Sequence, residues 1–185
     1  MDKAASIQLC DIRDIAQATR EAIKRLVNSN DQSCENIRSI LSNDTNHSNV
    51  DFPNKWCKFA SNALGRRIAR LTGHTEIALC KWEKDNSTAD HWWLRIDDAD
   101  VDITADQFDF TSNTVIVNKQ SQIHKQHFIP TTCSPFFAQP LMNLCFELAT
   151  ASLDHAISKD KECSAFDIAF AHLRQQNLQG HCYDQ

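Results

Sequence analysis

Apolar residues recur every three or four positions toward both ends of the chain, whereas the middle contains short runs in which apolar and polar residues alternate. The first pattern is that of amphipathic helices, and the second is that of strands with one buried face. The patterns predict helices over residues 3–28, 33–41, 53–72, 138–158 and 164–178, and strands over residues 77–83, 91–96, 100–104 and 114–117. Helices followed by strands and then by helices indicate an α+β fold with an antiparallel sheet.

The ends of these elements are marked by residues with special backbone preferences. Ser33 is a candidate cap for the second helix, Pro53 is expected to start the third, and Gly73 is expected to end it. Residues 42–51 are polar and turn-rich, which is typical of a loop. Residues 127–140 contain three prolines among aromatic side chains and are expected to form a semi-rigid apolar loop.

Length and composition limit the classes of protein that fit the chain. Its 185 residues suit a single domain over 1–185 with a substantial core. The excess of 24 acidic over 19 basic residues gives a net charge of −5, so we expect neither nucleic acid nor an anionic membrane as a partner. No apolar run reaches the roughly 18 residues of a membrane span.

The cysteine content bears on the cellular compartment. Eight cysteines are spread along the chain, several fall on apolar helix faces, and the first residues lack the apolar core of a secretory signal. We therefore expect free thiols in the reducing cytoplasm. Export as an effector, by a route that uses no cleaved signal, is the alternative location.

Cys57 is the first candidate for chemistry because it lies in the first turn of the predicted third helix. A thiol acts as a nucleophile only as the thiolate, and the unpaired amide groups of a helix N-terminus favour that negative charge. An adjacent imidazolium has the same effect. The alternative is a buried apolar cysteine on the core face of the helix, which is the commoner role of a free cysteine.

The predicted hairpin that turns at residues 97–99 carries a histidine on its first arm and aspartates on its second. Depending on the register of the turn, His91 meets the face that holds Asp100 and Asp102. Asp102 would then fix the tautomer of the imidazole and stabilise its cation. The alternative is a surface histidine with solvated aspartates at the turn. That alternative fits Asp100 well and Asp102 poorly, because Asp102 lies between two β-branched apolar residues.

Three motifs together resemble a known superfamily: Phe52-Pro-x-x-x-Cys57, His91-x-Trp-Leu-x-Ile-Asp and Val101-Asp102-Ile-Thr-Ala-Asp-Gln-Phe108. They are similar to those of a mostly uncharacterised bacterial group among the papain-like and transglutaminase-like cysteine hydrolases. The resemblance covers residues 52–128 and implies a catalytic-type core, in which a helix bearing the cysteine packs on a small antiparallel sheet. Residues 1–45 and 138–180 would supply additional flanking helices.

The resemblance also implies roles for individual residues. In that superfamily a cysteine at a helix start, a histidine on a strand and an aspartate on the next strand form a catalytic triad. Cys57 would be the nucleophile, His91 the general base and then the acid, and Asp102 the residue that orients the histidine. Members act as proteases, amidases, glutamine deamidases or acyltransferases. Two departures bear on substrate access: Trp92 directly follows the histidine, and the glycine expected at 54–56 is absent.

An oxyanion hole requires the backbone amide of Cys57 and a second hydrogen-bond donor. The candidates for that donor are Asn54, Trp56 and Gln107. Trp56 could equally pack in the core, and Gln107 could simply turn the chain after the third strand.

Other kinds of site have little support in the sequence. His124 and His127 form the only close histidine pair and have no cysteine at zinc-ligand spacing, so we expect no metal. No glycine-rich phosphate loop and no Gly-x-Ser-x-Gly motif is present, so we expect no cofactor. The basic run from Arg66 to Arg70 is interpreted as the solvent-exposed face of its helix.

These observations support two hypotheses. The first is a Cys–His–Asp hydrolase or acyltransferase that acts on an amide bond of a protein or peptide through an acyl-thioenzyme. The second is a papain-like fold without catalytic activity, which binds a partner protein through its flanking helices or the loop at 127–140. The presence of all three residue types in the right order favours the enzyme.

Overall fold

The structure, a computed structural model, describes residues 8–45, 50–83, 90–128, 130–136 and 144–180. Its helices are α1 (Leu9–Asn28), α2 (Gln32–Thr45), α3 (Cys57–Thr72), α4 (Gln122–His127), α5 (Leu144–Lys159) and α6 (Lys161–Gly180), with a short 3-10 helix, η1, at Ala105–Gln107. Its strands are β1 (Ile77–Glu83), β2 (Asp90–Ile96), β3 (Ala99–Asp102), β4 (Ile116–Lys119) and β5 (Thr132–Pro135). The prediction of an α+β fold is confirmed.

The five strands form one antiparallel sheet in the order β4-β3-β2-β1-β5. Strands β1, β2 and β3 each pair with the next strand along the chain, and β5 returns to pair with the other edge of β1. Ile96 pairs with Ala99, so Asp97 and Asp98 alone make the turn between β2 and β3. Asp97 has a φ of 51°, a left-handed conformation that aspartate tolerates better than most residues. The predicted antiparallel sheet and its hairpin turn are therefore confirmed.

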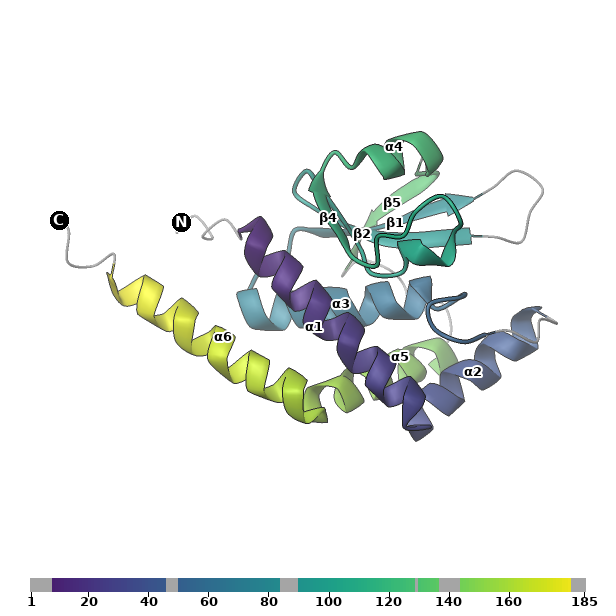
Figure 1. Ribbon diagram of the computed structural model, residues 1–185, viewed down its shortest axis with the longest axis horizontal. Helices are drawn as coiled ribbons and strands as arrows, with labels where there is room; N and C mark the ends of the chain where they lie inside the picture. The colour runs from purple at the N-terminus through teal and green to yellow at the C-terminus, as the bar shows by residue number, and fades with distance from the viewer. Residues whose placement is uncertain (1–7, 46–49, 84–89, 129, 137–143, 181–185) are drawn as a thin grey trace.

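Helices cover the two faces of the sheet unequally (Figure 1). α1 and α3 pack directly on one face, and α2, α5 and α6 form a further layer beyond them. The short helix α4 lies over the opposite face. The sheet is therefore enclosed between a thick helical layer and a thin cover made by α4 and the segment after it.

The side chains of β2 alternate between these two environments, as the period of a strand requires. Leu94 and Ile96 join the main core between the sheet and the helices. His91 and Trp93 point to the other face, where Trp93 packs with Cys80 and Phe128 in a second, smaller core. The histidine singled out in the sequence therefore lies under the α4 cover.

α3 was predicted to begin at Pro53, but it begins at Cys57. A turn occupies residues 52–55 and is closed by a hydrogen bond from the Trp56 N–H to the Pro53 carbonyl oxygen. Lys55 has a φ of 65°, which no helical residue adopts, so the helix cannot start earlier. Cys57 is thus the first residue of α3, and Trp56 before it provides no capping side chain.

The second half of the sheet differs from the prediction in several places. β3 ends at Asp102, and not at residue 104, because the chain turns there into η1. β4 runs over 116–119 in place of the predicted 114–117. Residues 132–135, predicted as part of an apolar loop, form the edge strand β5, where a proline is tolerated because one side of the strand needs no ladder hydrogen bonds.

α2 is capped differently from the prediction and is longer. The backbone N–H of Ser33 donates to the Asp31 carboxylate at 2.8 Å, so Asp31, and not Ser33, supplies the cap. The helix continues to Thr45, into the segment predicted as a loop at 42–51. Parts of the predicted elements, residues 3–7, 46–49 and 138–143, lie outside the described residues.

The basic run of α3 is only in part the solvent-exposed face that the sequence suggested, because Arg70 is exposed and Arg67 is not. Arg67 is completely buried, pairs with Asp167 of α6 and donates to Oγ1 of Thr19 of α1 at 2.8 Å. Arg66 pairs with Glu147 of α5 at 2.8 Å. Arg67 is buried because it follows the apolar stripe of α3 at helical spacing, and its guanidinium ties three helices together.

The expectation that the cysteines are free thiols is wrong for two of them. Cys80 and Cys133 are directly opposed on β1 and β5 and form a disulfide, because the unpredicted strand β5 brings them together. The free cysteines among the described residues are Cys10, Cys34, Cys57, Cys145 and Cys163. Cys182 lies outside the described residues. No described helix combines the length and the apolar character needed to cross a membrane.

Candidate active site

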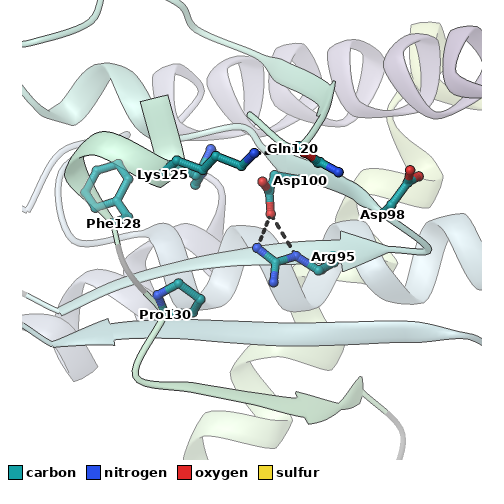
Figure 2. Close-up of a pocket in the computed structure, with 8 residues that line it drawn as sticks. Arg95, Asp98, Asp100, Gln120, Lys125, Phe128 and Pro130 are labelled. Carbon is teal, nitrogen blue, oxygen red and sulfur yellow. Dashed lines mark hydrogen bonds and ion pairs between the residues drawn. The ribbon is translucent and has the colours of Figure 1, made fainter. Parts of the chain in front are cut away.

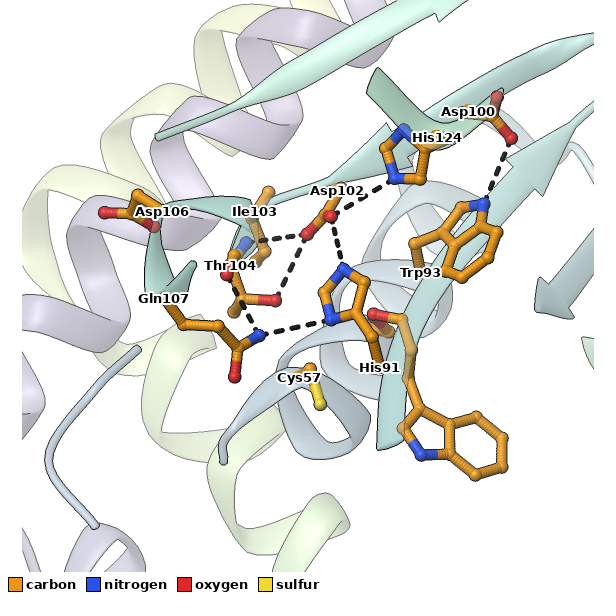
Figure 3. Close-up of polar contacts among 12 residues, drawn as sticks. Cys57, His91, Trp93, Asp100, Asp102, Ile103, Thr104, Asp106, Gln107 and His124 are labelled. Atoms are coloured by element: carbon orange, nitrogen blue, oxygen red, sulfur yellow. Dashed lines mark hydrogen bonds and ion pairs between the residues drawn. The ribbon is translucent and has the colours of Figure 1, made fainter. Parts of the chain in front are cut away.

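Cys57 lies at the N-terminal end of α3, next to the start of β2 (Figure 3). The Ser61 hydroxyl of α3 donates to the carbonyl oxygen of Trp92 at 3.1 Å, and the Cys57 thiol donates to that of Asp90 at 3.8 Å. Asp90 and Trp92 flank His91, so these two contacts place the thiol beside the imidazole, with which it also interacts.

His91 and Asp102 meet across the hairpin, as the sequence predicted for one register of the turn. Nε2 of His91 lies 2.6 Å from Oδ2 of Asp102, and neither side chain is exposed to solvent. This distance is typical of a hydrogen bond assisted by charge. The aspartate is therefore placed to orient the imidazole.

Asp102 accepts hydrogen bonds at both of its oxygens. Oδ1 accepts from the backbone N–H of Thr104 at 2.8 Å and from its hydroxyl at 3.1 Å. Oδ2 is shared by His91 and by His124, whose Nε2 lies 3.3 Å away. A carboxylate with this many donors is stabilised as an anion even when it is buried.

Charge and burial act in opposite directions on the two residues of the pair. Burial disfavours the imidazolium, but the Asp102 charge, its hydrogen bond and the Cys57 thiol outweigh this effect and raise the pKa of His91 to about 10. Burial likewise raises the pKa of Asp102, but the His91 charge and the hydrogen bonds from both histidines bring it well below its usual range. Asp102 is consequently an anion, and His91 has a strong affinity for a proton.

Gln107 is the hydrogen-bond partner of Nδ1, the second ring nitrogen of His91. The Gln107 Oε1 accepts from the Lys55 N–H at 3.3 Å, and its Nε2 donates to the Thr104 carbonyl oxygen at 3.0 Å. The same Nε2 lies 3.1 Å from Nδ1 of His91. When the ring is neutral, Nδ1 accepts from this NH₂ group, which can only donate, and the imidazole proton is on Nε2. This is the tautomer that a general base needs.

The thiol and the imidazole each have another partner in this state. The thiol is directed to the Asp90 carbonyl oxygen, and the Nδ1 lone pair accepts from Gln107. Proton transfer from Cys57 to His91 requires the thiol to turn toward Nδ1 and Gln107 to release it. Catalytic hydrogen bonds commonly become short only once substrate is bound.

The predicted oxyanion candidates are only partly brought together. Gln107 lies in the site. Trp56 is completely buried, and its indole N–H donates to the Val50 carbonyl oxygen, which is the core role left open by the sequence. Asn54 belongs to the turn before α3, where its backbone N–H donates to Asp51, and no hydrogen bond between described residues joins its side chain to His91.

The two neighbouring aspartates have partners of their own. Asp100 is buried, accepts from the Trp93 indole at 3.0 Å and pairs with Arg95 at 2.7 Å, so it is not the solvated turn residue that was predicted. Asp106 pairs with Arg20 at 2.6 Å. Of these three carboxylates, Asp102 is the one hydrogen-bonded to His91.

Sequence reasoning missed His124 and Ser121. His124 lies on α4, is buried, and its Nδ1 lies 2.9 Å from the Ser121 hydroxyl oxygen. Ser121 in turn caps α4 by accepting from the His124 N–H at 3.4 Å. The sequence offered a weak signal, a serine three residues before a histidine, which is the spacing of a capped first turn.

His91, Asp102 and His124 could also hold a metal ion, since their ligand atoms lie within 4.8 Å of one another. Two ligands of a tetrahedral zinc ion stand about 3.3 Å apart, given zinc–ligand bonds of about 2.0 Å. The 2.6 Å between His91 and Asp102 is instead a hydrogen-bond distance. The arrangement is that of a hydrogen-bonded cluster, and the absence of a metal stays a prediction.

A cavity of about 430 Å³ adjoins this cluster on the α4 side of the sheet (Figure 2). Its lining includes Arg95, Asp100, His124, Lys125, Phe128 and Pro130. Two of these lining residues contact the cluster: the Phe128 ring lies 4.5 Å from the His91 ring, and His124 is hydrogen-bonded to Asp102. The cavity therefore reaches the back of the cluster, opposite to α3 and its cysteine.

Comparison of the chain with protein-family models, with curated proteins and with solved structures finds no match. The resemblance to papain-like and transglutaminase-like hydrolases therefore stays a prediction, and the functional argument depends on the geometry described above.

Proposed function

We propose that the protein is a cysteine-dependent hydrolase or acyltransferase of papain-like or transglutaminase-like organisation, which acts on an amide bond. The observation that carries this proposal is the position of His91, beside the Cys57 thiol and hydrogen-bonded through Nε2 to the buried Asp102. The substrate class we propose is a protein or peptide in the cytoplasm, cut by a peptidase or amidase reaction or deamidated at a glutamine side chain.

The proposed reaction begins with proton transfer from the Cys57 thiol to Nδ1 of His91. The thiolate then forms a bond to the amide carbonyl carbon, and the C=O electron pair moves onto oxygen. When that pair returns, the C–N bond breaks and His91 gives its proton to the leaving amine, or to ammonia if the amide is that of glutamine. Asp102 remains an anion throughout and stabilises the imidazolium.

The second half of the reaction releases the acyl group from sulfur. Water, or an amine in the case of acyl transfer, gives a proton to His91 and attacks the thioester carbonyl carbon. The C–S bond breaks, and the proton returns from His91 to the Cys57 sulfur. Hydrolysis and acyl transfer thus share every residue and differ in the nucleophile that reaches the acyl group.

The oxyanion would be stabilised by two donors. The backbone N–H of Cys57 is one of the first amide groups of α3, which have no partner inside the helix. Gln107 is the second, because its side-chain N–H groups lie beside the imidazole and one of them is set free once Nδ1 takes up the thiol proton. The sequence also made Gln107 a candidate for the second donor of an oxyanion hole.

A protein-binding module without activity is the second candidate, and one observation favours it. Cys57 is only 4% exposed and His91 is completely buried, so a substrate has little access to the thiol in this state. An extended side chain such as glutamine needs the least opening of the site. If the thiol proves unreactive, the binding module replaces the enzyme.

The proposal is tested by alkylation of Cys57 with iodoacetamide from pH 5 to 8, read by mass spectrometry for each cysteine. We expect Cys57 to react at pH 6 faster than the exposed Cys10 and Cys145, and this advantage to disappear in His91→Ala. The matched control is His172→Ala, which removes an exposed histidine of α6. If His91→Ala leaves the rate unchanged, the enzyme proposal is wrong. A reactive Cys57 is then assayed for ammonia release from glutamine-containing peptides and for peptide cleavage.

A further inference from the structure

The Asp102 carboxylate is hydrogen-bonded to a second imidazole, that of His124, which has no role in the proposed reaction. Figure 3 shows His91 and His124 approaching Asp102 from different elements, β2 and α4. Both point Nε2 to the same oxygen, Oδ2, at 2.6 Å and 3.3 Å respectively. His124 is as buried as the pair that it touches.

The hydrogen-bond partners of His124 define which nitrogen carries the proton. The Asp102 carboxylate can only accept, so Nε2 of His124 is the donor to Oδ2, and Nδ1 of the neutral ring is left to accept from the Ser121 hydroxyl, 2.9 Å away. A nitrogen that accepts from a hydroxyl is not itself protonated in the neutral ring. The proton is then on Nε2, from which it is donated to Asp102. Ser121 and His124 thus form a directed chain of hydrogen bonds that ends at Asp102.

This chain fixes the plane of the carboxylate. Thr104 holds Oδ1 through its backbone N–H and its hydroxyl, and His124 holds Oδ2 from the α4 side. Without His124, Oδ2 keeps His91 as its only donor among the hydrogen bonds described here. The carboxylate then turns more freely about its terminal bond, and the His91 proton loses a fixed acceptor.

We infer that His124 is a positioning residue of the triad: it holds the Asp102 carboxylate in the orientation that receives the Nε2 proton of His91. The inference rests on the proposed function, since positioning matters only if His91 acts as a base. It makes the site a Cys–His–Asp–His arrangement in which α4, far from the cysteine in sequence, contributes to thiol reactivity.

The neighbouring cavity makes this role open to chemical rescue. His124 lines the cavity, so truncation of its side chain joins the vacated space to a volume that a small molecule can enter. Imidazole diffusing through the cavity can then place an N–H group near Oδ2. A purely structural defect, in contrast, is not repaired by a small molecule that carries the missing donor.

The experiment compares three variants by the alkylation rate of Cys57 at pH 6 to 8. His124→Leu keeps the volume without the donor, His124→Gln keeps an N–H donor near the Nε2 position, and His124→Gly opens the cavity. We expect a fall of about tenfold or more in His124→Leu, a change within about threefold in His124→Gln, and partial recovery of His124→Gly with added imidazole. Thermal unfolding of each variant is measured in parallel, and His127→Leu on the same helix is the control.

Two further outcomes separate this inference from its alternatives. A wild-type rate in His124→Leu, or an equal loss in His124→Gln and His124→Leu without imidazole rescue, overturns it. A rate that rises with EDTA and falls with added Zn²⁺ in the wild type, but not in His124→Leu, identifies a metal ligand and overturns it too. If wild-type Cys57 shows no special reactivity, the proposed function fails first. The NMR resonance of the His91 Nε2 proton then decides, since an unchanged resonance in His124→Leu also overturns the inference.

Discussion

Nε2 of His91 and Oδ2 of Asp102 lie 2.6 Å apart with both side chains fully shielded from solvent. A buried acid and base at this distance stabilise each other's charged forms, and removal of either one leaves the other without compensation. This interdependence makes the pair measurable both through thiol reactivity and through stability.

Asp102→Asn should abolish most of the special reactivity of Cys57. An amide cannot balance an imidazolium and can favour the wrong tautomer of His91, so we expect the alkylation rate at neutral pH to fall by about 100-fold or more. Asp100→Asn and Asp106→Asn are the matched controls, because those carboxylates pair with Arg95 and Arg20. A greater loss in either control than in Asp102→Asn would remove Asp102 from the triad.

The stability of the protein should fall as the pH rises above neutrality. Folding raises the pKa of His91 from its ordinary value of 6.5 to about 10, so between these values the folded state binds a proton that the unfolded state has lost. The stabilisation is complete below pH 6.5 and declines by about 1 kcal/mol per pH unit above it. Urea unfolding at pH 6.5, 7.5 and 8.5 measures this decline.

His91→Gln is the reference for that pH dependence, and its unfolding free energy should change much less over the same range. The urea unfolding measurements stop below pH 9, because above that pH the buried thiols of Cys34 and Cys163 add a pH dependence of their own to the free energy of unfolding. A wild-type slope no steeper than that of His91→Gln would show that His91 is not the proton-binding group.

The remaining buried cysteines should be nearly inert while the protein is folded. Burial raises the pKa of the Cys34 thiol to about 12 and that of the Cys163 thiol to about 11. Both thiols therefore stay protonated at neutral pH, and we expect them to be alkylated at least about 100-fold more slowly than the exposed Cys10. Labelling in urea should remove the difference. Fast labelling of Cys34 without denaturant would indicate that α2 opens in the native state.

Arg67→Met should destabilise the fold without reducing thiol reactivity. The substitution keeps the packing volume but leaves Asp167 and Thr19 without the guanidinium that joins α6 and α1 to α3. We expect a loss of about 2–4 kcal/mol in the free energy of unfolding, measured by urea titration. Arg66→Met, whose arginine pairs with Glu147 in a more exposed position, should cost less than about 1 kcal/mol.

Reduction of the disulfide should lower stability by an amount set mainly by the loop that it closes. Cys80 and Cys133 are separated by 53 residues, for which chain entropy gives about 4 kcal/mol. A phosphine reductant should shift the urea midpoint of the wild type and leave that of the Cys80→Ser, Cys133→Ser double variant unchanged. An equal shift of the urea midpoint in both proteins would show that the reductant does not act through the Cys80–Cys133 disulfide.

Strand alternation predicted the central relationship of the site for one register of the turn, and the observed pairing has that register. His91 lies an odd number of residues from the core residues Leu94 and Ile96, and Asp102 directly follows the core residue Val101. Because Leu94 pairs with Val101, the apolar residues of both strands share one face of the sheet, and His91 and Asp102 share the other. The start of α3 was misplaced because the preference of proline for a helix start competes with the turn at 52–55, and only tertiary contacts decide between them.

Three features of the structure were not predicted from the sequence. β5 is exposed along its whole length, so it shows no alternation, and its pairing with β1 creates the disulfide. α4 has six residues, too few for a helical period, and its histidine meets an aspartate 22 residues away in sequence. The burial of Arg67 was visible in its spacing from the core positions of α3 and was outweighed by its charge.

The disulfide between Cys80 and Cys133 also divides the site by connectivity. His91, Asp102, Gln107 and His124 all lie inside the covalent ring that it closes, whereas Cys57 lies on the chain that leads into the ring. The residues proposed for acid–base chemistry thus belong to one circular unit, and the proposed nucleophile is attached to it through the short connection between Gly73 and Ile77. A single break in that connection would leave the ring whole and make the helix with the cysteine a separate piece, held by packing alone.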